Sequence, residues 1–199
     1  MSFIVTGCGR SGTTRMKMAL EACGAAVNQE GWFNPYREKV TEDDVAEYLS
    51  LGWSDVSWLA APFITEFNVP VLHLVRHPVD VANSFLYLGD FREGIYGAFI
   101  GRHVSLTLTS ELRDVLIYWD QWNALCERAK NWLLVRVEDM AEKAETIERF
   151  LGIRGLQEAW VNTPEYANRQ SGYRRIVSRD CVVNLPSDVR ERMMRYGYE

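Results

Sequence analysis

Short apolar segments alternate with longer amphipathic segments along the chain, and this pattern predicts alternating strands and helices. The apolar segments have the length of strands, and the one at 69–75 is almost wholly apolar. Strands that are apolar on both faces are typical of a parallel sheet covered by helices. We expect strands at 3–6, 25–28, 69–75 and 132–137.

Start and stop signals predict where the helices lie. Thr41 and Asp44 have the spacing of a capping box, Pro78 suits the first turn of a helix, and Gly152 is a typical C-cap. Ser110 is expected to cap a long helix in which apolar residues recur at helical spacing. We expect helices at 13–22, after 41, from 78, at 110–130, at 140–151 and after 186.

The alternation predicts an α/β fold of three layers, with a mainly parallel central sheet flanked by helices. The 199 residues contain no repeat, low-complexity tract or linker, so we expect a single domain over residues 1–199. Apolar residues make up 47% of the chain and charged residues 25%, which is the ordinary balance of a globular protein.

Charge and targeting signals limit the classes of partner and the cellular location that we expect. A net charge of −5 argues against nucleic acid, because binding to a phosphate backbone normally needs a basic surface. No apolar run is long enough to span a bilayer, and the first predicted strand leaves no room for a signal peptide. We therefore expect a cytoplasmic protein without a membrane partner. The four cysteines are scattered and predict neither a zinc site nor a disulfide framework.

The loop at 7–12, Gly-Cys-Gly-Arg-Ser-Gly, stands between the first strand and the first helix and has the outline of a phosphate-binding P-loop. Such a loop binds an anion through backbone amides and a helix N-terminus. Thr13 stands where a nucleoside-triphosphate hydrolase has its lysine, and the cation of this loop is Arg10. The loop therefore predicts an anion other than a triphosphate, with a purely geometric glycine turn as the alternative.

A second strand–helix unit offers another anion site. Arg76 ends the apolar run at 69–75, and Ser84 lies two helical turns into the following helix. The carboxyl edge of a parallel sheet is where α/β proteins bind nucleotides, and a guanidinium group presents a fork of donors to a phosphate. The alternative is a surface Arg76 that pairs with Asp80 or Glu66.

These segments resemble those of sulfotransferases that use 3′-phosphoadenosine 5′-phosphosulfate (PAPS). Residues 9–14 are similar to the family's loop for the 5′-phosphosulfate, and residues 75–84 are similar to its element for the 3′-phosphate. Arg-Val-Glu-Asp-Met at 136–140 resembles a third segment, usually Arg-Tyr-Glu-Asp-Leu. The three segments follow one another in the family's order, within residues 4–151.

The resemblance implies a role for each matching residue. Besides binding the 5′-phosphosulfate, Arg10 would stabilise the charge that develops on the leaving phosphate and the sulfuryl oxygens. The residues expected to hold the 5′-phosphosulfate are Gly9, Arg10, Ser11, Gly12, Thr13 and Thr14, and those expected to hold the 3′-phosphate are Arg76 and Ser84.

Two positions depart from the family pattern. Arg15 and Val137 stand where cytosolic relatives have an aromatic residue beside the adenine. We therefore expect the adenine to be held differently, either by stacking on Arg15 or by the arginine-rich stretch at 161–184, in which Arg174 is the predicted contact.

Sulfuryl transfer to a hydroxyl benefits from a general base near the acceptor. Cytosolic relatives use a histidine ahead of the 3′-phosphate strand, but none precedes His73 here, and His73 is expected to be structural within its strand. Tyrosylprotein and several bacterial types use a glutamate after the second strand. Glu30, twenty residues after Arg10, has that spacing and is the predicted base. The alternative for Glu30 is a solvated loop glutamate. The acceptor pocket is expected to be walled by Trp32, Phe33, Ser57 and Trp58.

The sequence thus predicts an enzyme that transfers the sulfuryl group of PAPS to a hydroxyl acceptor and releases 3′-phosphoadenosine 5′-phosphate (PAP), without a metal. Carbohydrate, peptide tyrosine, small alcohol and lipid headgroup all stay open as acceptors. A P-loop kinase that uses ATP and magnesium is one alternative, with Glu138 and Asp139 as a metal site rather than as the start of a helix. A catalytically silent nucleotide-binding module is the other.

Overall fold

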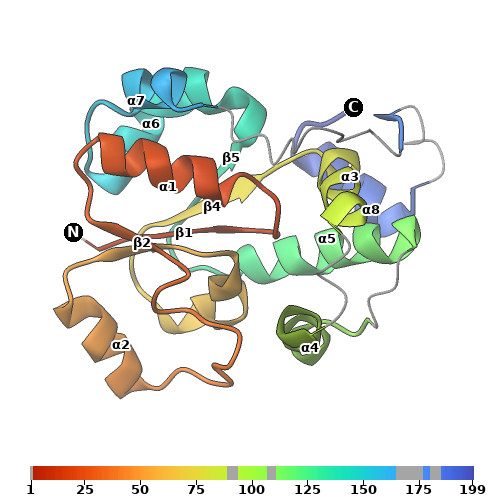
Figure 1. Cartoon of the computed structure of the whole chain (residues 1–199), viewed down its shortest axis with the longest axis horizontal. Helices are drawn as coiled ribbons and strands as arrows, with labels where there is room; N and C mark the ends of the chain where they lie inside the picture. The colour runs from red at the N-terminus through yellow and green to blue at the C-terminus, as the bar shows by residue number, and fades with distance from the viewer. Residues whose placement is uncertain (1, 89–93, 107–110, 165–176, 180–184) are drawn as a thin grey trace.

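A computed structural model describes residues 2–88, 94–106, 111–164, 177–179 and 185–199. Within these residues, five parallel strands form one sheet in the order β2-β3-β1-β4-β5 (Figure 1). The strands are β1 (Ile4–Gly7), β2 (Val27–Gln29), β3 (Ser54–Val56), β4 (Val71–Val75) and β5 (Trp132–Arg136). The predicted α/β class with a parallel central sheet is confirmed.

Helices connect the strands. They are α1 (Thr13–Ala22), α2 (Glu42–Ser50), α3 (Pro78–Leu88), α4 (Gly94–His103), α5 (Leu112–Cys126), α6 (Met140–Leu151), α7 (Leu156–Asn162) and α8 (Ser187–Arg195), with 3₁₀ helices η1 (Trp58–Glu66) and η2 (Val137–Asp139). None of the helices in the described ranges is long and apolar enough to cross a membrane.

Two apolar cores, one on each face of the sheet, account for the three layers. Helices α1, α6 and α7 cover one face, where Met16, Leu72 and Ile147 are fully buried. Helix α5 and η1 cover the other, where Trp119 and Trp122 are fully buried (Figure 1). Burial of each such side chain contributes roughly 1.5–3 kcal/mol or more to folding, so both faces of the sheet need their helical cover.

The central strand β1 brings the P-loop against the end of β4. Gly7 of β1 pairs with Leu74 of β4, and a Cβ atom at Gly7 would lie 2.1 Å from the Leu74 carbonyl oxygen. Only glycine permits this close approach of the two backbones. The loop after β1 and Arg76 after β4 therefore start from adjacent points of one sheet edge.

The local signals in the sequence place most of the helices correctly. Thr41 and Asp44 form the expected capping box of α2, Pro78 begins α3, and Gly152 caps α6 in a left-handed conformation. Ser110, the expected cap of α5, lies outside the described residues, and the N-cap position of this helix is occupied by Glu111. That helix ends at Cys126 rather than near 130, where the chain turns toward β5.

Candidate functional site

The carboxyl ends of the strands surround a pocket of about 230 Å³. The P-loop follows β1, Glu30 follows β2, Trp58 follows β3 after Ser57, and Arg76 follows β4. Parallel strands direct all these connections to one edge of the sheet. The pocket is lined by Arg10, Gly12, Thr13, Thr14, Arg15, Gln29, Glu30, Trp58, Arg76 and Tyr96.

The P-loop turns sharply at two positions of left-handed backbone. Gly12 has φ 89° at the N-cap of α1, a conformation that glycine adopts without strain. Arg10 has φ 73°, which for a residue with a side chain costs on the order of 1–3 kcal/mol and is often found at binding sites. Thr13 and Thr14 form the first turn of α1, whose amides have no carbonyl partner within the helix. These amides and the positive end of the helix dipole favour an anion in the pocket.

The back of the loop is fixed by hydrogen bonds within the protein. The Gly9 amide donates to the Tyr118 hydroxyl over 3.1 Å. The Ser11 amide donates to the Cys8 carbonyl over 3.1 Å, and the Ser11 hydroxyl donates to the same carbonyl. Ser11 is fully buried. Gly9 and Ser11, both predicted to touch the phosphosulfate, shape the loop in this structure, while Arg10, Gly12, Thr13 and Thr14 line the pocket.

The two predicted anion elements are in direct contact with each other. Arg10 Nε donates to Ser84 Oγ over 2.8 Å, and Arg76 Nη1 donates to the Arg10 carbonyl over 3.4 Å. Ser84 is buried behind Arg10 and does not itself line the pocket. Both residues thus line one pocket.

Asp80, one of the two alternative partners for Arg76, pairs with another arginine. Its carboxylate accepts from the Arg179 guanidinium. Burial raises the pKa of Asp80, but the hydrogen bond and charge of Arg179, with smaller effects of the charges of Arg76 and His77, lower it overall. Among the described residues, the pocket lining contains three arginines and one carboxylate, Glu30. A local positive charge therefore exists on a protein whose net charge is −5.

Glu30 lies at the start of a turn that leaves β2. Its backbone is left-handed, with φ 52°, and its amide donates to the Val56 carbonyl over 3.4 Å. Burial raises the pKa of Glu30, a hydrogen bond from the Trp58 side chain lowers it, and the charge of Asp55 raises it. The net shift is upward. A carboxylate with a raised pKa is a better proton acceptor near neutral pH.

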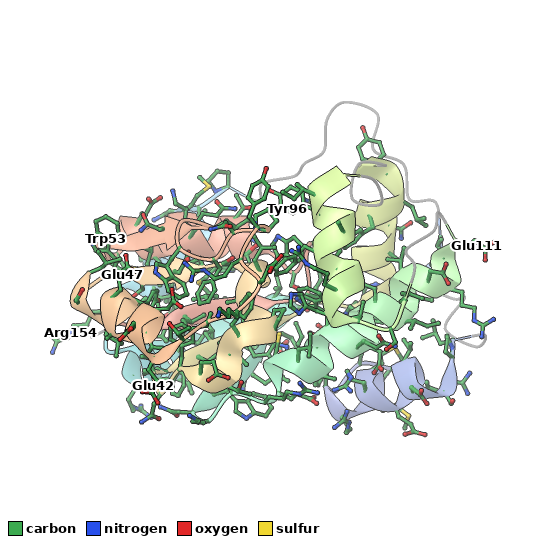
Figure 2. The ribbon with its side chains drawn as sticks, turned by 90° about the horizontal axis from the view of Figure 1, so that it is seen from below. Glu42, Glu47, Trp53, Tyr96, Glu111 and Arg154 are labelled. Carbon is green, nitrogen blue, oxygen red and sulfur yellow. The ribbon has the colours of Figure 1, made fainter. Side chains whose placement is uncertain are left out.

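Two aromatic rings flank Glu30 in the pocket. The Trp58 and Tyr96 rings lie 5.8 Å apart, and Tyr96 extends from α4 on the side that faces the sheet (Figure 2). Trp58 is held from behind by Trp122, whose Nε1 donates to the Trp58 carbonyl over 3.1 Å. Tyr96 could not be singled out from the sequence, because the short, glycine-containing helix α4 has no clear apolar period.

The other expected wall residues belong to the core. Phe33 is fully buried, and its ring packs edge-on against the ring of Trp32 at 4.8 Å. Ser57 is fully buried and caps η1, where its hydroxyl accepts from the Leu59 amide over 3.2 Å. Of the four residues expected to wall the acceptor pocket, Trp58 is the one that lines it.

Arg15 and Val137, which are expected near the adenine, are among the described residues. The Arg15 guanidinium lies 4.1 Å over the Trp160 ring and donates to the Trp160 carbonyl over 3.1 Å, so one of its faces is already stacked. Val137 lies against Gly12, where an added Cβ would approach a Val137 methyl group to 3.3 Å. Arg174, the predicted nucleotide contact, lies outside the described residues.

The two carboxylates after β5 are engaged within the protein. Glu138 accepts from the His77 amide over 3.3 Å and from the Tyr198 hydroxyl over 2.8 Å. Asp139 pairs with Arg136 through two contacts of 2.5 and 2.9 Å. Over the described part of the chain, no group of three or more histidine, cysteine or acidic side chains is arranged to hold a metal ion.

His73 has the structural role that its place within a strand predicts. It is fully buried in β4, and its ring Nε2 shares a hydrogen bond of 2.9 Å with the Asn123 side chain. Burial lowers the pKa of His73 to about 4, so the ring is neutral at pH 7.

Comparison of the sequence with models of known protein families and with curated proteins gave no match.

Proposed function

We propose that this protein transfers the sulfuryl group of PAPS to a hydroxyl acceptor and releases PAP. The observation that carries the proposal is the meeting of Arg10, Arg76 and Glu30 in one pocket at the carboxyl edge of a parallel sheet. Two guanidinium groups on separate elements suit a ligand with two separate anionic groups, and the carboxylate beside them suits a proton acceptor. The P-loop without lysine supports a phosphosulfate over a triphosphate.

Each group would act at a defined atom. Glu30 accepts the proton of the acceptor hydroxyl while the acceptor oxygen bonds to sulfur from the side opposite the leaving group. The bond between sulfur and the bridging phosphate oxygen breaks, and that oxygen keeps the electron pair. Arg10 and the first-turn amides of α1 stabilise the negative charge that develops there. Arg76 binds the 3′-phosphate and orients the nucleotide for this in-line displacement.

The alternatives have less support from the site. A kinase would need a cation in the place of Thr13 and free carboxylates for magnesium, whereas Glu138 and Asp139 are both engaged. A silent binding module would not need a half-buried carboxylate with a raised pKa, such as Glu30, beside the anion site. The acceptor stays open among carbohydrate, peptide tyrosine, small alcohol and lipid headgroup, and a cytoplasmic location stays a prediction from the sequence.

Nucleotide binding tests the proposal directly. A ligand that binds only the folded state raises the melting temperature by mass action. We expect PAP to raise it without magnesium, AMP to raise it less because AMP lacks the 3′-phosphate, and ATP with magnesium to raise it least. A larger effect of ATP with magnesium than of PAP would overturn the proposal in favour of the kinase.

A further inference from the structure

Asp55 is a buried carboxylate that the proposed reaction does not use. It lies in the middle of β3, between β2 and β1, and its exposed fraction is 1%. A buried carboxylate lowers stability unless hydrogen bonds compensate it. Asp55 Oδ2 accepts from the Trp32 amide over 3.1 Å and from the Phe33 amide over 3.3 Å. The carboxylate is therefore tied to the turn that begins at Glu30.

That turn needs support, because Glu30 has a left-handed backbone. A residue with a side chain at φ 52° is strained by on the order of 1–3 kcal/mol, and the surrounding contacts must hold it there. On one side, the Glu30 amide donates to the Val56 carbonyl of β3. On the other side, two and three residues later, the amides donate to Asp55 of the same strand. Strand β3 thus fixes the backbone on both sides of Glu30.

We infer that Asp55 is a positioning residue for Glu30: its buried carboxylate fixes the turn that aims Glu30 into the pocket and places a negative charge beside it. The inference rests on the proposed function for its role in the reaction. The coupling between the two carboxylates is a property of the fold and can be measured without an acceptor.

The charges around Glu30 define what Asp55 adds. Arg10, Arg15 and Arg76 line the same pocket. The hydrogen bond from Trp58 favours the ionised form of Glu30. The Tyr96 hydroxyl on α4 is neutral near pH 7, as any ordinary tyrosine is, and burial and the charge of Glu30 raise its pKa further. Burial and Asp55 oppose the ionised form of Glu30.

Asp55 itself changes charge in a measurable range. Burial raises the pKa of Asp55 to about 6, and the amides of Phe33 and Trp32 partly oppose this shift. At pH 7 and above, Asp55 is mostly ionised and disfavours a second negative charge on Glu30. Glu30 is thereby a stronger base than it would be beside a neutral residue.

The test is a titration of the Glu30 carboxyl carbon by NMR, with the resonance assigned by its loss in Glu30→Gln. Asp55→Asn keeps an oxygen that can accept from both amides but removes the charge. We expect the pKa of Glu30 to fall in Asp55→Asn. The matched control is Glu47→Gln, which makes the same change of charge on the exposed surface of α2 (Figure 2) and should leave the Glu30 titration unchanged.

The wild-type protein provides a second measurement that needs no variant. Since Asp55 titrates near pH 6, the Glu30 resonance should show a step there in addition to its own titration. A Glu30 titration with no such step, or one that is the same in folded Asp55→Asn as in wild type, would overturn the inference.

Asp55→Ala tests the positioning of the turn. It removes both hydrogen bonds, so we expect turnover of PAPS to fall by on the order of a hundredfold while the affinity for PAP stays unchanged. Asp55→Asn should restore most of the lost turnover. If Asp55 only stabilised the fold, turnover and PAP affinity would fall together in Asp55→Ala. If PAP fails to bind the wild-type protein but the two carboxylates are coupled, the proposed function fails and the link between Asp55 and Glu30 is supported. If PAP binds and the coupling is absent, the reverse holds.

Discussion

Arg10 and Arg76 come from loops 66 residues apart, and the structure joins them through the backbone carbonyl of Arg10 and a guanidinium nitrogen of Arg76. Ser84, predicted to bind the 3′-phosphate, accepts from Arg10 and so supports the cation of the P-loop. Arg10 therefore links residues of both predicted anion elements.

The role of Arg76 can be separated from that of Arg10 by the choice of ligand. Arg76→Ala should weaken PAP binding by about 10- to 100-fold, the usual effect of losing a hydrogen bond to a charged group. It should weaken adenosine 5′-phosphosulfate binding much less, because that ligand has no 3′-phosphate. Calorimetry with both ligands measures the difference, and Arg149→Ala, an exposed arginine on α6, is the matched control. Equal weakening of both ligands would assign Arg76 to another part of the nucleotide or to the fold.

Glu30→Gln separates chemistry from binding. The amide keeps the size of the side chain but cannot accept the proton, so turnover on an alcohol should fall by roughly a hundred- to ten-thousand-fold, while PAP affinity stays near wild type. An acidic phenol arrives partly deprotonated and should lose less. In wild type, kcat/KM should fall as the pH drops through the raised pKa of Glu30, because protonation removes the base. Equal turnover of an alcohol by the two proteins would exclude Glu30 as the base.

The strand–loop–helix units could be predicted from the sequence, and the irregular elements could not. The P-loop, Arg76 and Glu30 follow strands whose apolar runs or spacing are visible in the sequence. Strand β3 has three residues, of which Ser54 and Asp55 are polar, so its sequence gives no strand signal. It becomes a strand because β1 and β2 pair with it on both sides. Asp55, the residue inferred to position Glu30, therefore could not be singled out before the strand pairing was known.

Helix α2 offers a test of an element that carries no residue of the pocket. The Thr41 hydroxyl accepts from the Asp44 amide, and the Asp44 carboxylate accepts from the Thr41 amide. Thr41→Ala should lower the free energy of unfolding by about 1 kcal/mol and the melting temperature by about 2–4 °C. Thr41→Ser keeps the cap and should lie near wild type. Nucleotide affinity should be unchanged in both variants, and a loss of PAP binding in Thr41→Ala alone would show that α2 supports the pocket.

The fold gathers positive charge at one edge of the sheet in a protein that is acidic as a whole. The composition argued against anionic macromolecules, and the pocket nevertheless contains three arginines. Net charge describes the whole surface, whereas a site depends on which loops the sheet topology brings together. The alternation of strands and helices predicted the shared edge. This alternation could not predict that Tyr96 lines the pocket, because the sequence of α4, the helix that carries it, has no clear apolar period.

Two buried groups make global stability depend on pH in opposite directions. Asp55 has a pKa of about 6 in the folded state against 3.8 for an ordinary aspartate, so the folded state binds more protons between these values and stability falls as the pH rises. His73 has a pKa of about 4 against 6.5 for an ordinary histidine, so the unfolded state binds more protons and stability rises with pH over nearly the same range.

These two contributions should largely cancel in the wild-type protein, and removing one of them should expose the other. In Asp55→Asn, the free energy of unfolding should rise from pH 4 to pH 6.5 by up to about 3 kcal/mol more than it does in wild type, since one pKa unit corresponds to about 1.4 kcal/mol. Urea denaturation of both proteins at several pH values measures the difference. Because Glu47 is exposed, the Glu47→Gln control removes no buried acid and should follow the wild-type curve. Parallel curves for Asp55→Asn and wild type would mean that Asp55 titrates at its ordinary pKa in the folded protein, and that its burial in β3 is compensated fully by the amides of Trp32 and Phe33.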